Sequence, residues 1–276
     1  MSEQGRATLL GLAVGTAREA GELILRLRDE GVEVAGTKSS EIDIVTRADQ
    51  AAEALVKERL LGARPDDGML GEEGDDVRGT SGVVWIVDPI DGTVNYLYGL
   101  PHFSVSIAAE VDGEVVAGVV VAPALALEYV ATLGGGASCN GRPIHPRAAV
   151  PLAERLVGTG FSYEQPARAR EATYIARLLP RVRDLRRLGS CALDLCAVAS
   201  GTLDAYVEEG PHIWDHAAAG LVVLEAGGIL EVTRSPGDKR LLVCAPEDGF
   251  AEFRAAVVDA GFVGGEGPDG PRTSRE

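Results

Sequence analysis

Apolar residues at the start of the chain recur every three or four positions, and the period then changes. The first set predicts a long amphipathic helix over residues 7–28. Apolar and polar residues alternate over residues 42–46, as they do in a strand, and helical spacing returns from about Ala48. The beginning of the chain therefore predicts a helix, a short strand and a second helix.

The next part of the chain contains apolar runs separated by turn residues. Strands are predicted at residues 83–87, 103–111, 114–122 and 127–133. Asp112-Gly113 separates the second run from the third and is a strong signal for a tight hairpin. Helices followed by an antiparallel meander indicate an α+β arrangement for this half.

Beyond a turn-rich stretch at residues 140–151, strand and helix patterns alternate, which indicates α/β. Strands are predicted at 155–161, 183–189, 203–209, 229–233 and 241–245, and helices at 167–179, 191–200, 215–226 and 248–260. We therefore predict an α+β domain over residues 1–142 and an α/β domain over 152–262. The polar tail at 263–276 is predicted to be disordered.

Composition limits the class of protein. The chain has 276 residues, 46% of them hydrophobic, and can bury a large core. Its formal charge of −16 would repel a nucleic-acid backbone, so nucleic acid is not expected as a partner. For the same reason, a phosphorylated substrate would need cations in the site, which points toward metal.

The sequence gives no sign of a membrane or of export. No apolar run approaches the roughly 18 to 20 residues that cross a bilayer, and the N-terminus lacks a signal-peptide pattern. The four cysteines form no C-x-x-C pair, which is typical of reduced thiols. These features predict a cytoplasmic protein without a membrane partner.

The stretch "WIVDPIDGTVNYLYG" places Asp88 and Asp91 three residues apart, directly after a predicted strand. Asp and Pro commonly end strands, so an ordinary turn explains the pattern as well as chemistry does. The chemical alternative is that both carboxylates, with the Ile90 carbonyl between them, face one point and bind Mg²⁺. Gly92 and Thr93 then open a predicted short helix, whose N–H groups suit a phosphate.

Three other acidic positions gain meaning beside this stretch. Glu72 in "LGEEG" follows a turn, and alone it indicates a solvated acidic loop. Asp215 in "WDHAAAG" begins a predicted helix, where an N-cap aspartate is common. Thr46 and Asp49 have the spacing of a capping box, which explains Asp49 at least as well as catalysis does.

Taken together, these motifs resemble the inositol monophosphatase family. The resemblance covers roughly residues 7–262 and rests on "TKSSEIDIVTRAD", "GEEG", "WIVDPIDGTVNYLYGLPHFSVSIA", "GTGF", "LGSCALDLCAVASG", "DAYVEEG" and "WDHAAAGLVVLEAGG". It implies a layered αβαβα sandwich, usually dimeric, and a lithium-sensitive enzyme with two or three Mg²⁺ ions. The implied metal ligands are Glu72, Asp88, the Ile90 carbonyl, Asp91 and Asp215.

The resemblance also implies roles for other residues. Thr93 and Asp49 match the pair that activates the attacking water, with Glu72 beside them in the catalytic set, and Lys38 matches a basic position near the metals. The implied substrate contacts are Asp91, Gly92, Thr93, Gly189, Ser190, Cys191, Glu208 and Asp215. Cys191 departs from the family, where alanine or threonine is more usual. Glu208 matches the glutamate that binds inositol hydroxyls, although alone it indicates a solvated strand end.

The implied activity is Mg²⁺-dependent hydrolysis of a small phosphomonoester by a metal-activated water. Two Mg²⁺ ions would neutralise the four carboxylates and support an in-line displacement. The motifs favour inositol 1-phosphate over histidinol phosphate, fructose 1,6-bisphosphate and 3′-phosphoadenosine 5′-phosphate. Some family members also act as partners of the transcription machinery, so a binding role is the alternative from another class.

Overall fold

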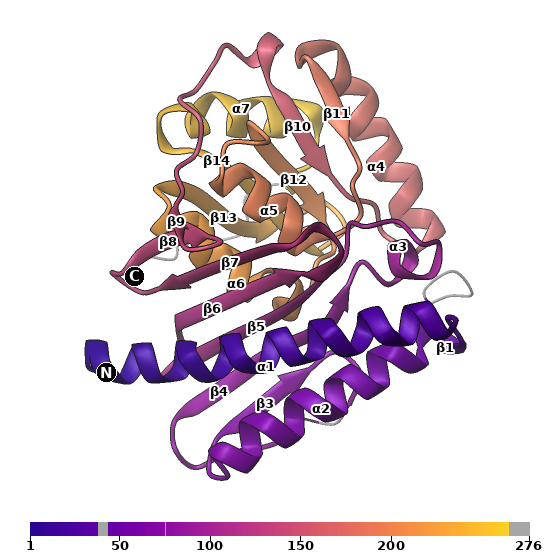
Figure 1. Ribbon diagram of the computed structural model, residues 1–276. Helices are drawn as coiled ribbons and strands as arrows, with labels where there is room; N and C mark the ends of the chain where they lie inside the picture. Colours follow the sequence, from indigo (N-terminus) through magenta and orange to yellow (C-terminus); the bar gives the residue numbers. More distant parts are fainter. Residues whose placement is uncertain (38–43, 75, 265–276) are drawn as a thin grey trace.

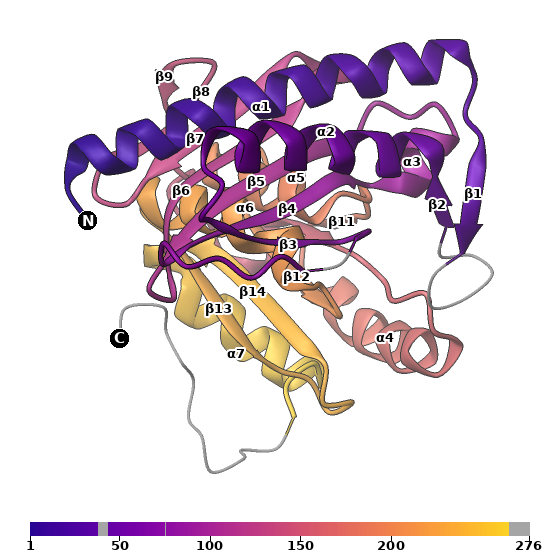
Figure 2. The same ribbon diagram turned by 90° about the horizontal axis from the view of Figure 1, so that it is seen from below.

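Helices and sheets alternate in five layers through the protein (Figures 1 and 2). The structure is a computed structural model, and it describes all residues except 38–43, 75 and 265–276. The longer helices are α1 (Glu3–Glu30), α2 (Arg47–Ala63), α4 (Gln165–Leu178), α5 (Cys191–Ala199), α6 (Ile213–Glu225) and α7 (Phe250–Ala260), with the five-residue α3 at Thr93–Leu97.

The strands form two large sheets and one short pair. The seven-stranded sheet has the order β3 (Gly68–Gly71), β4 (Val83–Asp91), β5 (Ser104–Val111), β6 (Glu114–Ala122), β7 (Leu127–Thr132), β8 (Gly136–Cys139) and β9 (Arg142–Pro143). The five-stranded sheet has the order β11 (Asp184–Arg186), β10 (Leu156–Thr159), β12 (Ala205–Glu209), β14 (Arg240–Pro246) and β13 (Gly228–Arg234). β1 (Val34–Thr37) pairs with β2 (Ile44–Thr46).

Among the described residues, three clusters of buried apolar side chains fill the spaces between the layers, and the central cluster contacts both sheets. Strand side chains alternate between faces, so neighbouring residues of one strand enter different cores. Trp85 and Val87 of β4 pack under α1 and α2, while Ile86 between them faces α5 and α6. On the second sheet, the inward face packs on the same central helices, and the outward face packs against α4 and α7. The predicted αβαβα sandwich is therefore confirmed.

The predicted elements are present with small changes in their ends. α1 begins earlier than expected because Ser2 caps it, accepting a hydrogen bond from the Gly5 N–H. The Asp112-Gly113 hairpin is confirmed, with both residues at positive φ. Four strands, β1, β3, β8 and β9, were not predicted, because each has at most four residues and none shows clear alternation.

The second sheet is mixed rather than purely parallel. β11, β10 and β12 are parallel, whereas β14 runs antiparallel to both β12 and β13. The reason is that the turn "SPGDK", residues 235–239, folds β13 and β14 into a hairpin, and its second arm returns beside β12.

Several predictions fall on residues that the structure does not describe or does not test. Lys38 and all but the first two residues of the predicted disordered tail lie outside the described residues. The division into domains at 1–142 and 152–262 stays a prediction, because α5 and α6 form one core with both sheets. Among the described helices, none is long and apolar enough to cross a membrane. All four cysteines lie in described segments and are free thiols.

Candidate active site

A pocket of about 310 Å³ opens between the two sheets. Its walls come from the end of β4, the start of α3, the segments before α4 and α6, and the β13–β14 hairpin. Most of the predicted site residues line it, namely Glu72, Asp88, Ile90, Asp91, Gly92, Thr93, Gly189, Cys191 and Asp215. The fold thus brings residues from distant parts of the chain to one place.

The end of β4 differs from its prediction. The strand does not stop at Val87 but continues to Asp91, with an irregularity in its pairing to β5 between Asp88 and Asp91. The Asp88 carboxylate accepts a hydrogen bond of 3.0 Å from the Ile90 N–H. A β-bulge of this kind re-aims side chains, and it lets both aspartates line the same pocket although they lie three residues apart.

Asp91 is held by the first turn of α5. Its carboxylate accepts hydrogen bonds from the Ser190 hydroxyl (2.5 Å) and from the backbone N–H groups of Ala192 (2.8 Å) and Cys191 (3.2 Å). The positive end of a helix stabilises a carboxylate in this position. Ser190, a predicted substrate contact, is buried and is not among the pocket-lining residues, so its observed contact is with Asp91.

Thr93 connects the pocket to a buried carboxylate behind it. The Thr93 hydroxyl lies 3.1 Å from Asp49 Oδ1 and 3.0 Å from the Ile90 carbonyl oxygen. The other carboxylate oxygen of Asp49 accepts a 2.8 Å hydrogen bond from the Thr46 N–H and another from the Thr46 hydroxyl. The capping box predicted for α2 is therefore confirmed, and the same Asp49 carboxylate also reaches the pocket through Thr93.

α3 is fixed on two sides, although it has only one and a half turns. The Tyr96 hydroxyl donates a 2.8 Å hydrogen bond to the Ile24 carbonyl of α1. Asn95 donates hydrogen bonds of 2.7 Å to the carbonyls of His102 and Leu188. Asn95 thereby joins the Thr93 helix to the loop before Gly189. This role could not be predicted from the sequence, because nothing in a lone helical asparagine indicates a partner far along the chain.

Glu72 is positioned by a buried glutamate that the sequence analysis also missed. The Glu53 carboxylate of α2 accepts a 2.8 Å hydrogen bond from the Glu73 N–H. A Cβ atom at Gly71 or Gly74 would lie 2.6 or 2.5 Å from the Glu53 carboxylate oxygens. The two glycines of "GEEG" therefore let the loop wrap around Glu53. This pair of glycines is the feature of the sequence that could have indicated such close packing.

Asp215 lies within the first turn of α6 rather than at its N-cap. The helix begins at Ile213, and the Asp215 carboxylate accepts a 2.5 Å hydrogen bond from the His212 N–H. The predicted N-cap role of Asp215 is therefore wrong. His212 is the N-cap residue, and Asp215 lies three positions after it. Asp215 accepts a hydrogen bond from an N–H group at the helix start and also lines the pocket.

The pocket concentrates negative charge away from water. Burial raises the pKa of Asp88 well above its ordinary value, and the adjacent carboxyls of Glu72 and Asp91 raise it further. The pKa of Asp215 is raised by burial and then by the same two neighbours. Burial raises the pKa of Asp91 to about 6, although its hydrogen bonds from Ser190 and Ala192 oppose the change. A bound cation would offset the repulsion between these carboxylates and stabilise their ionised forms.

The donor set fits a hard divalent cation. Carboxylate and carbonyl oxygens are the ligands that Mg²⁺ prefers, and Glu72, Asp88, Ile90, Asp91 and Asp215 offer them in one pocket. Among the described residues that line it, Lys239 is the one lysine or arginine, and it is paired with Glu164. Within the described ranges, no three acidic, histidine or cysteine side chains already form a metal-binding group, so a bound ion would have to draw the carboxylates together.

Glu208 does not line the pocket, whereas its neighbour Glu209 does. Glu208, the predicted substrate contact, is half-buried and accepts a hydrogen bond from the Tyr206 hydroxyl, but it is not among the pocket-lining residues. Burial raises its pKa to about 7. Its neighbour Glu209 lines the pocket and pairs with Arg170 of α4 at 3.2 Å. The alternation of β12 places the two glutamates on opposite faces of the sheet, which the sequence alone did not resolve.

Gly92→Ala is expected to lower the free energy of unfolding by about 2 kcal/mol, because Gly92 has φ +97°. A Cβ atom there would also lie 2.9 Å from the His102 carbonyl oxygen and 3.0 Å from that of Gly189. Thermal and urea unfolding measure the change. Gly15→Ala in α1 is the matched control, since it meets nothing within 4 Å and should raise the melting temperature slightly. Equal effects at the two positions would contradict the close packing of Gly92.

Comparison with known proteins agrees with this geometry. A family model described as the inositol monophosphatase family matches residues 6–258. The chain belongs to the inositol monophosphatase family. This is a family of metal-dependent phosphatases, so the protein is a phosphatase by descent, and the resemblance drawn from its motifs is confirmed.

Individual relatives cover most of the chain. The inositol-1-monophosphatase SuhB of Mycobacterium tuberculosis is 43% identical over 271 residues, covering 91% of this chain and 93% of its own length. The Nus factor SuhB of Escherichia coli is 38% identical over 226 residues, covering 80% of this chain and 84% of its own. The crystal structure of the extragenic suppressor protein SuhB of Bartonella henselae superposes with a TM-score of 0.84 at 33% identity, covering 91% of this chain and 98% of its own.

Proposed function

We propose that the protein hydrolyses a small phosphomonoester in a Mg²⁺-dependent reaction, with inositol 1-phosphate as the favoured substrate. The observation that carries this proposal is the cluster of Glu72, Asp88, Asp91 and Asp215 in one pocket, with the pKa values of the three aspartates raised. Buried like charges of this kind cost stability, so their concentration in one pocket favours a functional role over a structural one.

Three of the four carboxylate positions are supported by contacts in the fold. Glu72, Asp88, the Ile90 carbonyl, Asp91 and Asp215 would hold the Mg²⁺ ions, two or three in number. Bound Mg²⁺ would polarise the phosphoryl group, lower the pKa of a bound water and stabilise the leaving alkoxide. The Glu53 carboxylate fixes the Glu72 loop, the first turn of α5 fixes Asp91, and the first turn of α6 fixes Asp215. These contacts limit how far the three carboxylates must move when a bound ion draws the cluster together.

Thr93 and Asp49 would orient the attacking water and receive its proton. The Thr93 hydroxyl lines the pocket, and the Asp49 carboxylate lies behind it, buried and 3.1 Å away. A hydroxyl can accept a proton on one side while it donates on the other. The Thr46 contacts fix the Asp49 carboxylate in the orientation that this transfer requires. The water attacks phosphorus, the alkoxide leaves, and no covalent intermediate with the protein is needed.

The proposal is tested by measuring phosphate release with and without Mg²⁺. The purified protein is assayed with inositol 1-phosphate, histidinol phosphate, fructose 1,6-bisphosphate and 3′-phosphoadenosine 5′-phosphate. We expect activity that excess chelator abolishes, Mg²⁺ restores and millimolar Li⁺ inhibits, with kcat/KM highest for inositol 1-phosphate. Activity that persists in chelator would contradict the metal mechanism, and a higher kcat/KM for another of the four would reassign the substrate.

Glu208→Gln is expected to reduce kcat/KM for inositol 1-phosphate by roughly ten to a hundredfold, since one charged hydrogen bond contributes about 1.5 to 3 kcal/mol. The same variant should lose much less with a simple aryl phosphate, which lacks the hydroxyl donors. The structure adds a pH dependence, because the pKa of Glu208 is raised to about 7. The carboxylate that accepts from hydroxyls forms only as pH rises through that value. Equal losses on both substrates would instead assign Glu208 to the support of the fold.

A binding role in transcription is the second candidate, favoured by the Nus factor name of the relatives from Escherichia coli and Pseudomonas aeruginosa. The intact carboxylate set and Thr93 favour a catalytic protein, because binding alone does not require them. If the wild-type protein hydrolyses none of the phosphomonoesters but binds the transcription machinery, the second candidate would be favoured.

We also propose that the protein is a cytoplasmic homodimer. Light scattering with size-exclusion chromatography would test its oligomeric state.

A further inference from the structure

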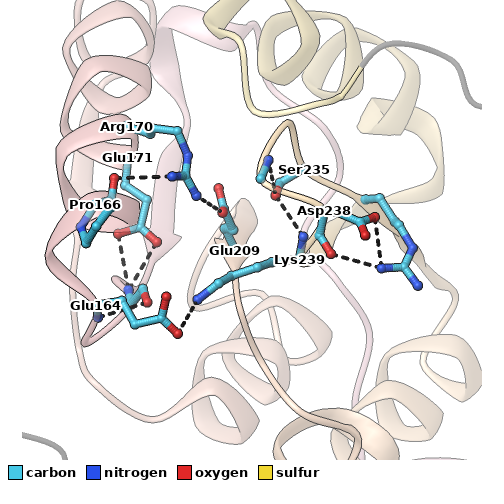
Figure 3. Close-up of polar contacts among 11 residues, drawn as sticks. Glu164, Pro166, Arg170, Glu171, Glu209, Ser235, Asp238 and Lys239 are labelled. Carbon is cyan, nitrogen blue, oxygen red and sulfur yellow. Dashed lines mark hydrogen bonds and ion pairs between the residues drawn. The ribbon is translucent and has the colours of Figure 1, made fainter. Parts of the chain in front are cut away.

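The outer wall of the pocket carries an ion pair. Lys239, in the turn of the β13–β14 hairpin, reaches across to Glu164 just before α4, with 2.8 Å between Nζ and Oε1 (Figure 3). Both residues line the pocket. Their side chains are 28% and 52% exposed, so the pair lies at the mouth rather than among the buried carboxylates.

The two ends of this ion pair are held in place by further contacts. Ser162 donates its N–H to both carboxylate oxygens of Glu171, at 3.1 Å each, which fixes the segment before α4. Arg170 pairs with buried Glu209 at 3.2 Å and ties α4 to β12 (Figure 3). The Lys239 N–H lies 3.3 Å from the Ser235 hydroxyl within the hairpin turn. The ion pair is therefore built on two anchored segments.

We propose that the Glu164–Lys239 pair is a charge filter that selects against substrates with a second phosphate. This inference rests on the proposed phosphatase function and adds a determinant of its specificity. When a phosphomonoester binds to the metals through its phosphate, the remainder of the molecule extends toward the mouth. There it meets a carboxylate and an ammonium group that already neutralise each other.

The chemistry of the pair favours a neutral polyol. Hydroxyl groups donate to the Glu164 carboxylate and accept from the Lys239 ammonium group, so a polyol satisfies both. A second phosphate would compete with Glu164 for Lys239 and would meet the Glu164 charge at close range. Because the pair is partly exposed, we expect a moderate effect on binding rather than an absolute block.

The test compares a substrate that has two phosphate groups with one that has a single phosphate group, in the full-length protein. The readout is the ratio of kcat/KM for fructose 1,6-bisphosphate to that for 4-nitrophenyl phosphate, or the inhibition constant of the bisphosphate where its turnover is undetectable. Glu164→Gln should raise this ratio about five- to tenfold, because it frees Lys239 and removes a like charge. Lys239→Gln should lower the ratio about three- to tenfold, because it leaves Glu164 unpaired.

Matched controls lie in the same hairpin. Asp238→Asn and Arg234→Gln remove the same charges from an exposed ion pair of 3.1 Å that does not line the pocket. We expect the ratio to change less than twofold in both controls. In the Glu164→Gln/Lys239→Gln double variant, the gain from Glu164→Gln should shrink, since the freed ammonium group is missing.

The outcomes separate the filter from the proposed function. An unchanged ratio in Glu164→Gln and Lys239→Gln, with Mg²⁺-dependent hydrolysis of the aryl phosphate intact, would overturn the filter and leave the phosphatase proposal standing. If the ratio changed equally in the control variants, the net charge of the protein would explain the effect, and the filter would be overturned. Wild-type protein without Mg²⁺-dependent activity on any phosphomonoester would contradict the proposed function, and the filter would fall with it.

Discussion

Asp88→Asn is expected to lower kcat by several orders of magnitude and, without metal, to stabilise the fold. The loss of activity follows because an amide replaces a charged ligand at the centre of the carboxylate cluster. The gain in stability follows because Asp88 is buried beside Glu72 and Asp91, which raise its pKa well above the ordinary value. A change that decreases activity while increasing stability is typical of a functional site.

The sign of the pH dependence follows from the direction of this shift. Below its ordinary pKa of 3.8, Asp88 is protonated in both folded and unfolded protein and contributes no difference. As pH rises from 3.8 toward the raised native pKa, the unfolded carboxyl loses its proton while the native one keeps it, so stability falls, and it levels off above the native pKa. Without metal, the melting temperature of Asp88→Asn should therefore exceed that of the wild type at pH 7.5, and the two should converge in acid.

Phosphate-release kinetics and thermal unfolding with and without Mg²⁺ test both parts of this prediction. Mg²⁺ should raise the melting temperature of the wild type more than that of Asp88→Asn, because the variant offers a weaker site. Asp112→Asn in the β5–β6 hairpin is the matched control, since it removes the same charge in a turn outside the pocket. An Asp88→Asn protein with wild-type kcat would rule out the carboxylate cluster as the metal site.

Thr93→Val is expected to lower kcat by about 10² to 10³ while leaving Mg²⁺ binding nearly unchanged. Valine keeps the shape of threonine but removes the hydroxyl that joins the pocket to Asp49. Positioned proton transfer contributes about 10² to 10⁴ to the rate of a reaction. The loss should appear in kcat rather than in KM, because the hydroxyl acts on the water and not on the bound phosphate.

Steady-state kinetics and calorimetric titration with Mg²⁺ separate these possibilities. Thr93→Ser should restore most of the rate, since it returns the hydroxyl that reaches Asp49 and the Ile90 carbonyl. A large fall in Mg²⁺ affinity in Thr93→Val would instead show that Thr93 supports the metal ligands. A variant with full activity would contradict the proposed relay from Thr93 to Asp49.

The sequence alone predicted most elements and most of the residues that line the pocket. The helical period of α1 and α2, the Asp112-Gly113 hairpin and the alternation in the second half are local patterns, and local patterns survive folding. The motifs around Glu72, Asp88 and Asp215 also predicted one pocket before the structure showed that these residues share it. The strands that were missed are too short for alternation to identify them.

Only the tertiary structure decided which residues support the site and which face its mouth. Glu53 holds the Glu72 loop, Asn95 joins α3 to Leu188, and Glu164 pairs with Lys239. These contacts join residues that lie 20 to 93 positions apart. The pairing of β14 with β12, which places the hairpin turn at the pocket, depends on the whole second sheet. A sequence pattern reflects the period of one element. These contacts depend instead on how separate elements pack against each other, so only the tertiary structure identifies them.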